Sequence, residues 1–372
     1  MEKFIHGMDI SSMDEVVNLG GKYYDKGEER ELTDILKSYG VNYIRLRLWQ
    51  NPYTQEKIPY GAGVNDLDTT IRMIKKVKAE GFKYLLDFHY SDFWTDPGKQ
   101  IKPKAWKDYG TEELEVALYE YTRETLLTLK EEGYLPDMVQ VGNEITNGIL
   151  WPEGKVSEPE NLIRFINAGI RGVRKVSRDI PVMLHLDQGN EQKLYQDWFD
   201  NYKRLGGEEF DIIGLSYYPV WNGKINGLIE NMNALADRYG KRMIVVEVSQ
   251  PFTMEDYGAY EGLTPKQRKG SAVKPEKAKM LEYPATKKGQ QDFMEHFLEG
   301  LSNVKKGLGA GYFYWEPAWI PVKGSGWATP ESLAYMQDKG PCGNEWANQG
   351  LFDYEGNALP TLEVIKKYSL RL

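Results

Sequence analysis

Short apolar runs alternate with longer amphipathic segments along almost the whole chain. The runs are strand-sized and rich in β-branched and aromatic residues, whereas the apolar positions of the longer segments recur with the period of a helix. The runs predict eight strands, at residues 4–9, 42–49, 83–89, 138–143, 181–186, 211–217, 242–247 and 311–315. The amphipathic segments predict eight helices, at residues 29–39, 66–80, 112–132, 159–177, 191–205, 224–239, 288–305 and 361–368.

Eight strand–helix units in series predict an α/β fold, a closed (β/α)8 or TIM barrel that forms one domain over residues 1–372. The alternative is a doubly wound open sheet. That fold favours a phosphate-binding glycine loop after its first strand, and the residues Asp-Ile-Ser-Ser at 9–12 do not form such a loop. The barrel is therefore the better interpretation.

The connections that follow the predicted strands are longer than those that precede them. The longest are residues 90–110, 249–286 and 316–360, after the third, seventh and eighth strands. In a barrel these connections all emerge at the carboxyl-terminal face of the sheet, where active sites lie. Residues 257–284 are rich in Lys, Gly and Pro, which predicts that this part is mobile.

Composition narrows the classes of partner. Hydrophobic residues make up 41% of the chain and charged residues 27%, as in a soluble globular protein. The apolar runs are too short to cross a membrane. The net charge is −8 and the 47 Lys and Arg residues are scattered, which argues against nucleic acid and favours a neutral small molecule or polymer. We expect a monomer.

The single cysteine, Cys342, excludes an intrachain disulfide and any metal site made of several cysteines. No basic-then-apolar leader follows Met1. The sequence as written therefore predicts a cytoplasmic protein, and a secreted one only if a leader has been trimmed.

Two glutamates stand at the carboxyl ends of predicted strands. Glu144 directly follows the fourth strand, and Glu247 ends the seventh. These two strand ends face each other across the mouth of an eight-stranded barrel, and two carboxyl groups about 5–5.5 Å apart are what a retaining glycosidase needs. One carboxylate would attack the anomeric carbon, while the other would protonate the leaving oxygen and then deprotonate water. The alternative is that both glutamates cap loops through backbone N–H groups.

Arg45 and Arg47 lie on the second predicted strand, and either could hold Glu247 ionised. Side-chain alternation puts both arginines on the same side of the strand, so the sequence does not separate them. A structural ion pair is the alternative for each arginine. Glu144 would need a raised pKa to act as an acid.

The two carboxyl groups are expected to have histidine neighbours. His89 and His185 follow the third and fifth strands, and we expect them to bind hydroxyl groups unless they are core histidines. No His-Glu-x-x-His or other local zinc pattern occurs, so no metal site is predicted. No Gly-x-Ser-x-Gly motif occurs either, which argues against a Ser-His-Asp hydrolase.

The chain holds 25 Tyr and 10 Trp residues, whose rings either fill a large core or stack on the apolar faces of sugars. The candidate sugar platforms are Trp94, Trp151, Trp221, Trp315, Trp319 and Trp327, and the candidate hydrogen-bonding residues are Asp92, Asp96, Asp187 and Asn190. Half of the tryptophans could serve packing instead, and the polar residues could be ordinary solvated loop residues.

Five sequence blocks at these strand ends are similar to those of a known family. They read Tyr-Ile-Arg-Leu-Arg-Leu-Trp at 43–49, Leu-Asp-Phe-His-Tyr-Ser-Asp-Phe-Trp at 86–94, Gln-Val-Gly-Asn-Glu-Ile-Thr at 140–146, Gly-Leu-Ser-Tyr-Tyr-Pro at 214–219 and Tyr-Trp-Glu-Pro-Ala-Trp at 314–319. The chain resembles the family 53 glycoside hydrolases, the endo-β-1,4-galactanases, from residue 7 to residue 360. That family belongs to clan A of (β/α)8 retaining enzymes.

The resemblance implies that Glu144 is the acid/base and Glu247 the nucleophile, and it favours Arg45 as the partner of the nucleophile. The residues that it implies around the −1 sugar are Arg45, His89, Asn143, Tyr217 or Tyr218, and Trp315. The implied substrate is β-1,4-galactan or galacto-oligosaccharides, cut internally with retention. The alternatives are another clan A enzyme, such as a β-mannanase or β-galactosidase, and a non-catalytic carbohydrate-binding barrel.

Many bacterial members of this family carry an Asp-x-Asp-x-His-x-Asn calcium loop after the nucleophile, but residues 254–261 here read Met-Glu-Asp-Tyr-Gly-Ala-Tyr-Glu. We therefore expect no calcium at that place and no required cofactor. An enzyme without a leader would trim imported galacto-oligosaccharides. We expect residues 257–284 to favour these short substrates by closing over the cleft.

Overall fold

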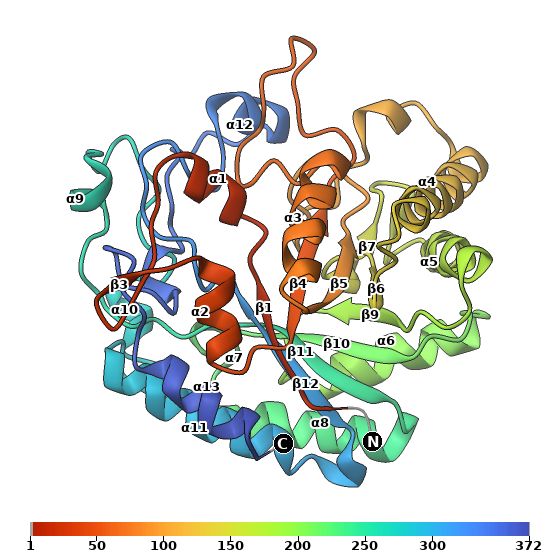
Figure 1. Ribbon diagram of the computed structural model, residues 1–372. Coiled ribbons are helices and arrows are strands. Elements are labelled where there is room, and N and C mark those ends of the chain that lie inside the picture. Colours follow the sequence, from red (N-terminus) through yellow and green to blue (C-terminus); the bar gives the residue numbers. More distant parts are fainter. Residues whose placement is uncertain (1–2, 372) are drawn as a thin grey trace.

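Eight parallel strands form a closed barrel in the computed structural model, which describes residues 3–371 (Figure 1). The strands are β1 (Ile5–Asp9), β4 (Tyr43–Leu48), β5 (Lys83–Phe88), β6 (Met138–Val141), β9 (Val182–Leu186), β10 (Ile212–Tyr217), β11 (Arg242–Val248) and β12 (Gly309–Trp315). Strand β1 pairs with both β4 and β12, which closes the sheet. The predicted barrel is confirmed, and the open-sheet alternative is wrong.

An outer layer of helices covers the barrel, with α4 and α5 packed side by side on one flank (Figure 1). The layer consists of α2 (Leu32–Ser38), α3 (Leu67–Ala79), α4 (Thr111–Glu131), α5 (Pro159–Val176), α6 (Gln192–Arg204), α8 (Ile225–Tyr239), α11 (Lys287–Ser302) and α13 (Thr361–Ser369). The ends of these helices and of the barrel strands differ from the predicted ends by at most three residues. Helix α2 begins later than predicted because Glu28 and Glu29 pair with Tyr24 and Asp25 in a hairpin.

Shorter elements lie mainly in the connections that leave the barrel strands. They are α1 (Met13–Asn18), α7 (Pro219–Asn222), α9 (Gly258–Glu261), α10 (Pro275–Ala278), α12 (Pro330–Met336), the 3-10 helices η1 (Lys104–Trp106), η2 (Ile145–Asn147), η3 (Lys305–Gly307) and η4 (Ala347–Gln349), and the paired strands β2 (Tyr24–Asp25) with β3 (Glu28–Glu29) and β7 (Gly148–Ile149) with β8 (Gly154–Lys155). They are too short for a periodic pattern to identify. Among residues 3–371, no helix has the length and apolar character needed to cross a membrane.

The interior of the barrel is apolar at its amino-terminal end. Side chains near the starts of the strands, including Ile5, Tyr43 and Leu85, form a separate buried cluster there. A Cβ on Gly7 would lie 2.4 Å from the ring of Phe313, so the close packing requires glycine at this position. Lys83 and Arg242, at the starts of their strands, line a separate pocket at this end, whereas the buried carboxylates of Asp9, Asp87 and Glu247 lie near the carboxyl ends of theirs.

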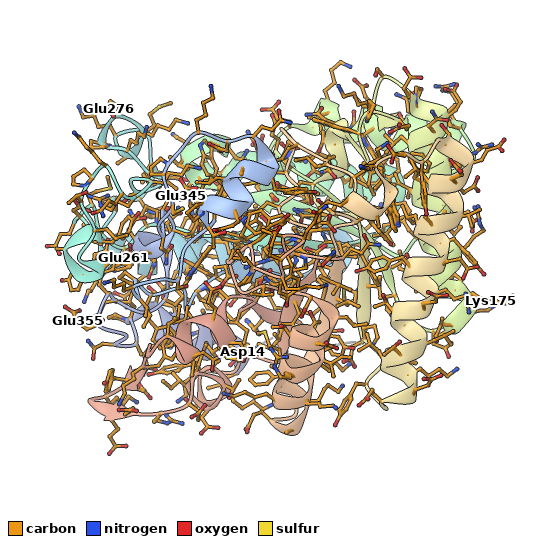
Figure 2. All side chains as sticks on the ribbon, turned by 90° about the horizontal axis from the view of Figure 1, so that it is seen from above. Asp14, Lys175, Glu261, Glu276, Glu345 and Glu355 are labelled. Atoms are coloured by element: carbon orange, nitrogen blue, oxygen red, sulfur yellow. The ribbon has the colours of Figure 1, made fainter. Side chains whose placement is uncertain are left out.

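The two longest connections, residues 249–286 and 316–360, meet beside the carboxyl-terminal end of the barrel. The N–H of Lys269 donates to the carbonyl oxygen of Cys342 over 2.6 Å. The Lys269 ammonium group pairs with Glu345 over 2.9 Å, and Figure 2 shows Glu345 well inside the outline of the molecule. The two connections thus support each other next to the barrel mouth.

Candidate active site

A cavity of about 390 Å³ opens at the carboxyl-terminal end of the barrel. Eleven of the fourteen predicted site residues line it, namely Arg45, Arg47, His89, Trp94, Asn143, Glu144, Asp187, Tyr218, Glu247, Trp315 and Trp319. The wall also contains Trp221, Trp327 and Asp96, which the sequence had offered as candidates, and Trp346, which it had not. The strand ends that the sequence pattern singled out thus meet at one cavity.

Two predicted site residues, Asp92 and Tyr217, are turned away from the cavity. Asp92 is fully buried and accepts hydrogen bonds from the N–H of Asn51 (3.0 Å) and from the ammonium group of Lys104 (2.9 Å). Neighbouring residues of a strand point to opposite faces, so Tyr217 points away from the cavity that its neighbour Ser216 lines. The hydroxyl of Tyr217 donates to the carbonyl oxygen of Gly223 over 2.6 Å. The expectation that Asp92 and Tyr217 contact a ligand there is therefore corrected.

The third predicted residue outside the cavity wall is His185, which is fully buried and lies 2.8 Å (Nε2) from the hydroxyl of Ser216. The expectation that it binds a ligand directly is corrected as well. The candidates Trp151 and Asn190 also lie outside the wall. The indole N–H of Trp151 donates to the carbonyl oxygen of Asn147 over 3.1 Å.

Arg45 is the centre of a buried ionic network beneath the cavity. Its Nη1 donates to Glu247 over 2.9 Å and to Asp9 over 3.0 Å. Its Nη2 donates to Asp87 over 2.8 Å and to the amide oxygen of Asn143 over 2.9 Å. Burial alone would lower the pKa of Arg45, but the three carboxylates raise it above its usual value. The guanidinium therefore stays charged although it is buried.

Arg47 has a different set of partners. Its Nη1 pairs with the buried carboxylate of Glu316. Its guanidinium lies 4.4 Å from the ring centroid of Trp94, so it also supports one wall of the cavity. Of the two arginines that the sequence could not separate, Arg45 is the one in contact with Glu247.

Both carboxylate oxygens of Glu247 accept hydrogen bonds. Oε1 accepts from Arg45, and Oε2 accepts from the hydroxyl of Tyr218 over 2.7 Å. Burial raises the pKa of Glu247, while Arg45 and Tyr218 act in the opposite direction. These two donors therefore stabilise the ionised form of a carboxyl group that burial would otherwise keep protonated.

Glu144 has less support for its ionised form. Its Oε1 accepts the hydroxyl of Ser216 over 2.6 Å. Burial raises the pKa of Glu144 well above its usual value, and the negative charges of Glu247 and Asp187 raise it further. Of the two carboxyl groups, Glu144 is the one that keeps its proton, because Glu247 holds the cationic partner.

The backbone at four strand ends takes a left-handed conformation that non-glycine residues rarely adopt. The φ angle is +50° at Tyr90, +46° at Glu144, +53° at Gln188 and +46° at Glu316. Each of these residues follows the last residue of a barrel strand by three positions or fewer. Glu144 and Gln188 line the cavity, so backbone strain coincides with the candidate site.

Tryptophan rings form much of the cavity wall. The rings of Trp94 and Trp315 lie 6.0 Å apart, and Trp315 lies 4.6 Å from Trp346. The ring of Trp346 lies 6.1 Å from that of Trp221. Trp221 is 49% exposed to solvent. Such a row of large, partly free rings suits a flat ligand with apolar faces.

Several residues of the site were not predicted. Asp9, Asp87 and Glu316 hold the two arginines, and Ser216 contacts Glu144. The three acids were detectable in principle, because a charge at the end of an apolar strand must find a partner or serve a function. Ser216 gives no such signal, since serine is common in strands and loops of every kind.

Within residues 3–371, no group of three or more His, Cys, Asp or Glu side chains is arranged to hold a metal ion. In the segment 254–261, Asp256 pairs with Arg268 and accepts the N–H of Gly258 over 2.9 Å. Asp256 therefore already has a cationic partner, Arg268. The expected absence of calcium and of a required cofactor stays a prediction.

Comparisons with known proteins agree with this geometry. The sequence model of Glycosyl hydrolase family 53 matches residues 5–365. The endo-beta-1,4-galactanase of Bacillus subtilis (strain 168) is 36% identical over 382 aligned residues, which cover 98% of this chain and 85% of the relative. The arabinogalactan endo-beta-1,4-galactanase of Cellvibrio japonicus (strain Ueda107) is 34% identical over 375 aligned residues, covering 98% of this chain and 90% of the relative.

A solved structure shows the same likeness in three dimensions. The GH53 catalytic domain of Ignisphaera aggregans has a TM-score of 0.89 and 38% sequence identity, and the match covers 98% of this chain and 95% of that one. The family match extends over nearly the whole length of the barrel. The chain therefore belongs to glycosyl hydrolase family 53.

Proposed function

We propose that this glycoside hydrolase is a retaining endo-β-1,4-galactanase that cuts galactan chains internally. The observation that carries the proposal is that Glu144 and Glu247 line one cavity and have different hydrogen-bond partners. Glu144 follows β6, and Glu247 lies next to the last residue of β11. The two relatives described above are named galactanases, and they supply the substrate class.

In the first step Glu247 is the nucleophile. Its carboxylate, stabilised by Arg45 and Tyr218, attacks the anomeric carbon and forms a glycosyl–enzyme ester while the glycosidic C–O bond breaks. Glu144 holds its proton because its pKa is raised, and it gives that proton to the leaving oxygen.

In the second step Glu144 is the base. Once Glu247 is bound in the ester it carries no charge, so one of the causes that raise the pKa of Glu144 disappears. The Glu144 carboxylate then takes a proton from water, whose oxygen attacks the anomeric carbon and releases Glu247. Two inversions at this carbon give overall retention.

The network beneath the cavity suits the charge that develops on the sugar. Arg45 faces the three carboxylates of Asp9, Asp87 and Glu247, so the ionised cluster carries net negative charge. A transition state with oxocarbenium character is positive and is stabilised by that field. His89, which lies 3.1 Å (Nε2) from Asp87 and lines the cavity, is the proposed partner of a sugar hydroxyl.

Residues 257–284 are proposed to limit the length of the bound chain. Lys269 from this segment lines the cavity, and its ammonium group lies 4.1 Å from the ring centroid of Trp327. The same ammonium group pairs with Glu345 of the other long connection. A contact of this kind supports a boundary at that end of the cleft.

The test compares wild type with Glu247→Ala on linear β-1,4-galactan, β-mannan and xylan. We expect wild type to release oligosaccharides from galactan alone and the variant to release none. Azide added to the variant with an activated β-galactoside should restore turnover and give a glycosyl azide of inverted configuration. Glu295→Ala, at a half-exposed surface pair with Lys367, is the control and should keep full activity.

Each part of the proposal has its own refuting outcome. If wild type leaves galactan intact and degrades mannan or xylan, the substrate class is wrong and another clan A activity replaces it. If it degrades none of these polymers, a carbohydrate-binding barrel becomes the better interpretation. If azide fails to restore the variant, Glu247 is not the nucleophile.

A further inference from the structure

A chain of hydrogen bonds connects Glu144 with the buried His185 through Ser216. The hydroxyl oxygen of Ser216 lies 2.6 Å from Oε1 of Glu144 and 2.8 Å from Nε2 of His185. On the other side of the imidazole ring, Nδ1 lies 3.3 Å from the backbone nitrogen of Glu144 and 3.1 Å from Nε2 of Gln140. The chain therefore starts and ends at the same residue, Glu144.

The backbone nitrogen of Glu144 fixes the direction of the protons in this chain. A backbone N–H can only donate, so Nδ1 of His185 is an acceptor and Nε2 carries the ring proton. His185 then donates to Ser216, whose own proton is left to donate to Oε1 of Glu144. The amide oxygen of Asn143 also lies 3.1 Å from Nδ1, but this oxygen can only accept, and it accepts a hydrogen bond from Arg45 over 2.9 Å.

The imidazole of His185 stays neutral. Burial lowers its pKa well below the usual value, and the charge of Arg45 together with His89 lowers it further. A neutral, buried ring does not exchange protons with Glu144 during the reaction. It affects Glu144 in two ways: it orients the hydroxyl of Ser216, and it accepts the backbone N–H of Glu144.

Side-chain alternation along β10 brings Ser216 into this position, because Ser216 lies on the same face of the strand as Ile212, which points into the barrel interior. The pairing of β10 with β11 shifts between Leu215 and Ser216, so that Ser216 lies opposite Glu247 instead of the preceding valine. The extra residue, Val246, belongs to β11, so this bulge redirects the side chain of Glu247 that follows it; bulges are frequent beside active sites. Ser216 belongs to the cavity wall, whereas the next residue, Tyr217, does not.

We propose that Ser216, oriented by His185, is a positioning residue that keeps the acidic proton of Glu144 on Oε2. The inference rests on the proposed role of Glu144 as acid/base. Because Oε1 accepts the Ser216 hydroxyl, the carboxylic proton belongs on the other oxygen. If the proton moved to Oε1, the hydroxyl of Ser216 would lose the acceptor that it has in the structure.

This arrangement gives both steps of the reaction the same oxygen. Oε2 of Glu144 donates to the leaving oxygen, and the same Oε2 then takes the proton from water. The hydroxyl of Ser216 remains a donor to Oε1 throughout, so it also favours the ionised form that the second step needs. Without Ser216 the proton of Glu144 would be shared between its two carboxyl oxygens, of which Oε1 is the one that faces position 216.

The test measures kcat/KM, which reports the first step, on two substrates that differ in their need for an acid. Galactotetraose has a leaving group that needs protonation, whereas 2,4-dinitrophenyl β-galactobioside has one that leaves without it. For Ser216→Ala we expect a loss of about tenfold on galactotetraose, as for one hydrogen bond to a charged group, and a loss of less than about twofold on the activated substrate. The basic limb of the pH profile should move to higher pH, because Ser216 lowers the pKa of Glu144.

Three variants serve as controls. Ser216→Thr keeps the hydroxyl and should retain the pH profile of wild type. Ser249→Ala removes another buried hydroxyl, which directly follows β11 and donates to Gln349 over 2.7 Å outside the cavity wall, and it should behave as wild type. In a double-mutant cycle, His185→Ala should lose less activity in the Ser216→Ala background than in wild type, because the part of its effect that passes through Ser216 is already gone.

Different results would refute the role proposed for Ser216 and the proposed galactanase function. The positioning role of Ser216 is overturned if Ser216→Ala loses the same factor in kcat/KM on both substrates and the basic limb of its pH profile does not move. It is also overturned if Ser216→Thr loses as much activity as Ser216→Ala. Additive losses in the double variant would overturn the part assigned to His185. If wild type does not cut galactotetraose, or if Glu144→Gln cuts it normally, the proposed function itself is wrong.

Discussion

Replacement of Arg45 by methionine tests how strongly the buried ionic network stabilises the barrel. Methionine has nearly the length of arginine but no charge, so Arg45→Met leaves Asp9, Asp87 and Glu247 buried without their common partner. Removing one partner of a buried pair costs about 3–5 kcal/mol. With an unfolding entropy of about 2.1 cal/mol/K per residue, the 372 residues give about 0.8 kcal/mol/K, so we expect the Tm to fall by about 4–6 °C.

The loss should depend on pH. Arg45 lowers the pKa of Glu247 against the effect of burial, so this pKa rises further in the variant. A carboxyl group whose pKa is higher in the folded than in the unfolded state destabilises the fold as the pH rises through that folded pKa. The difference in Tm between variant and wild type should therefore be largest at neutral pH and smaller near about pH 4, where unfolded glutamate is also largely protonated.

Scanning calorimetry at both pH values measures the effect. Arg238→Met is the matched control, because Arg238 pairs with Asp200 on the surface, where ion pairs contribute little. Its Tm should stay close to that of wild type. A Tm of Arg45→Met equally close to wild type at neutral pH, or a decrease of the same size at both pH values, would refute the reasoning.

Other variants test single contacts of the site. Tyr218→Phe removes a donor that lowers the pKa of Glu247, so the acidic limb of kcat/KM should move to higher pH; an unmoved limb would contradict this. Glu144→Gln should release a burst of dinitrophenol from the activated galactobioside and then stall for want of a base; steady turnover would exclude the assigned role. Lys269→Ala should lengthen the oligosaccharides released from galactan, as seen by chromatography, if Lys269 bounds the cleft.

The architecture could be predicted because its signals are local. Periodic apolar positions identify each barrel strand and each outer helix, and strands and helices in strict alternation leave few topologies besides a parallel barrel. The short helices and hairpins of the strand-to-helix connections depend on tertiary contacts instead. The pairing of residues 28–29 that shortens the first outer helix is such a contact.

The site was predictable where a charge interrupts an apolar strand and unpredictable where the decisive contact is remote. Glu144 and Glu247 were identified at their strand ends, but strand alternation left Arg45 and Arg47 open. The family resemblance favoured Arg45, whose contact with Glu247 joins residues 202 positions apart in the sequence. Asp92 looks like a site residue in the same block as His89, yet it serves a loop. The monomeric state, the cellular location and the mobility of residues 257–284 stay predictions.

The left-handed residues at the strand ends imply that local stability differs between the two ends of the barrel. At about 1–2 kcal/mol each, the four residues described above store about 4–8 kcal/mol, a large share of the roughly 5–15 kcal/mol by which proteins are stable. At the amino-terminal end, among the described connections that lead into the barrel strands, the non-glycine residue in this conformation is Lys306 (φ +60°). With this smaller load, amide hydrogens there should exchange more slowly than those at the catalytic end. Gln188→Gly should narrow that difference by relieving one strained residue. An enzyme built in this way keeps its chemistry at the end of the barrel that opens first.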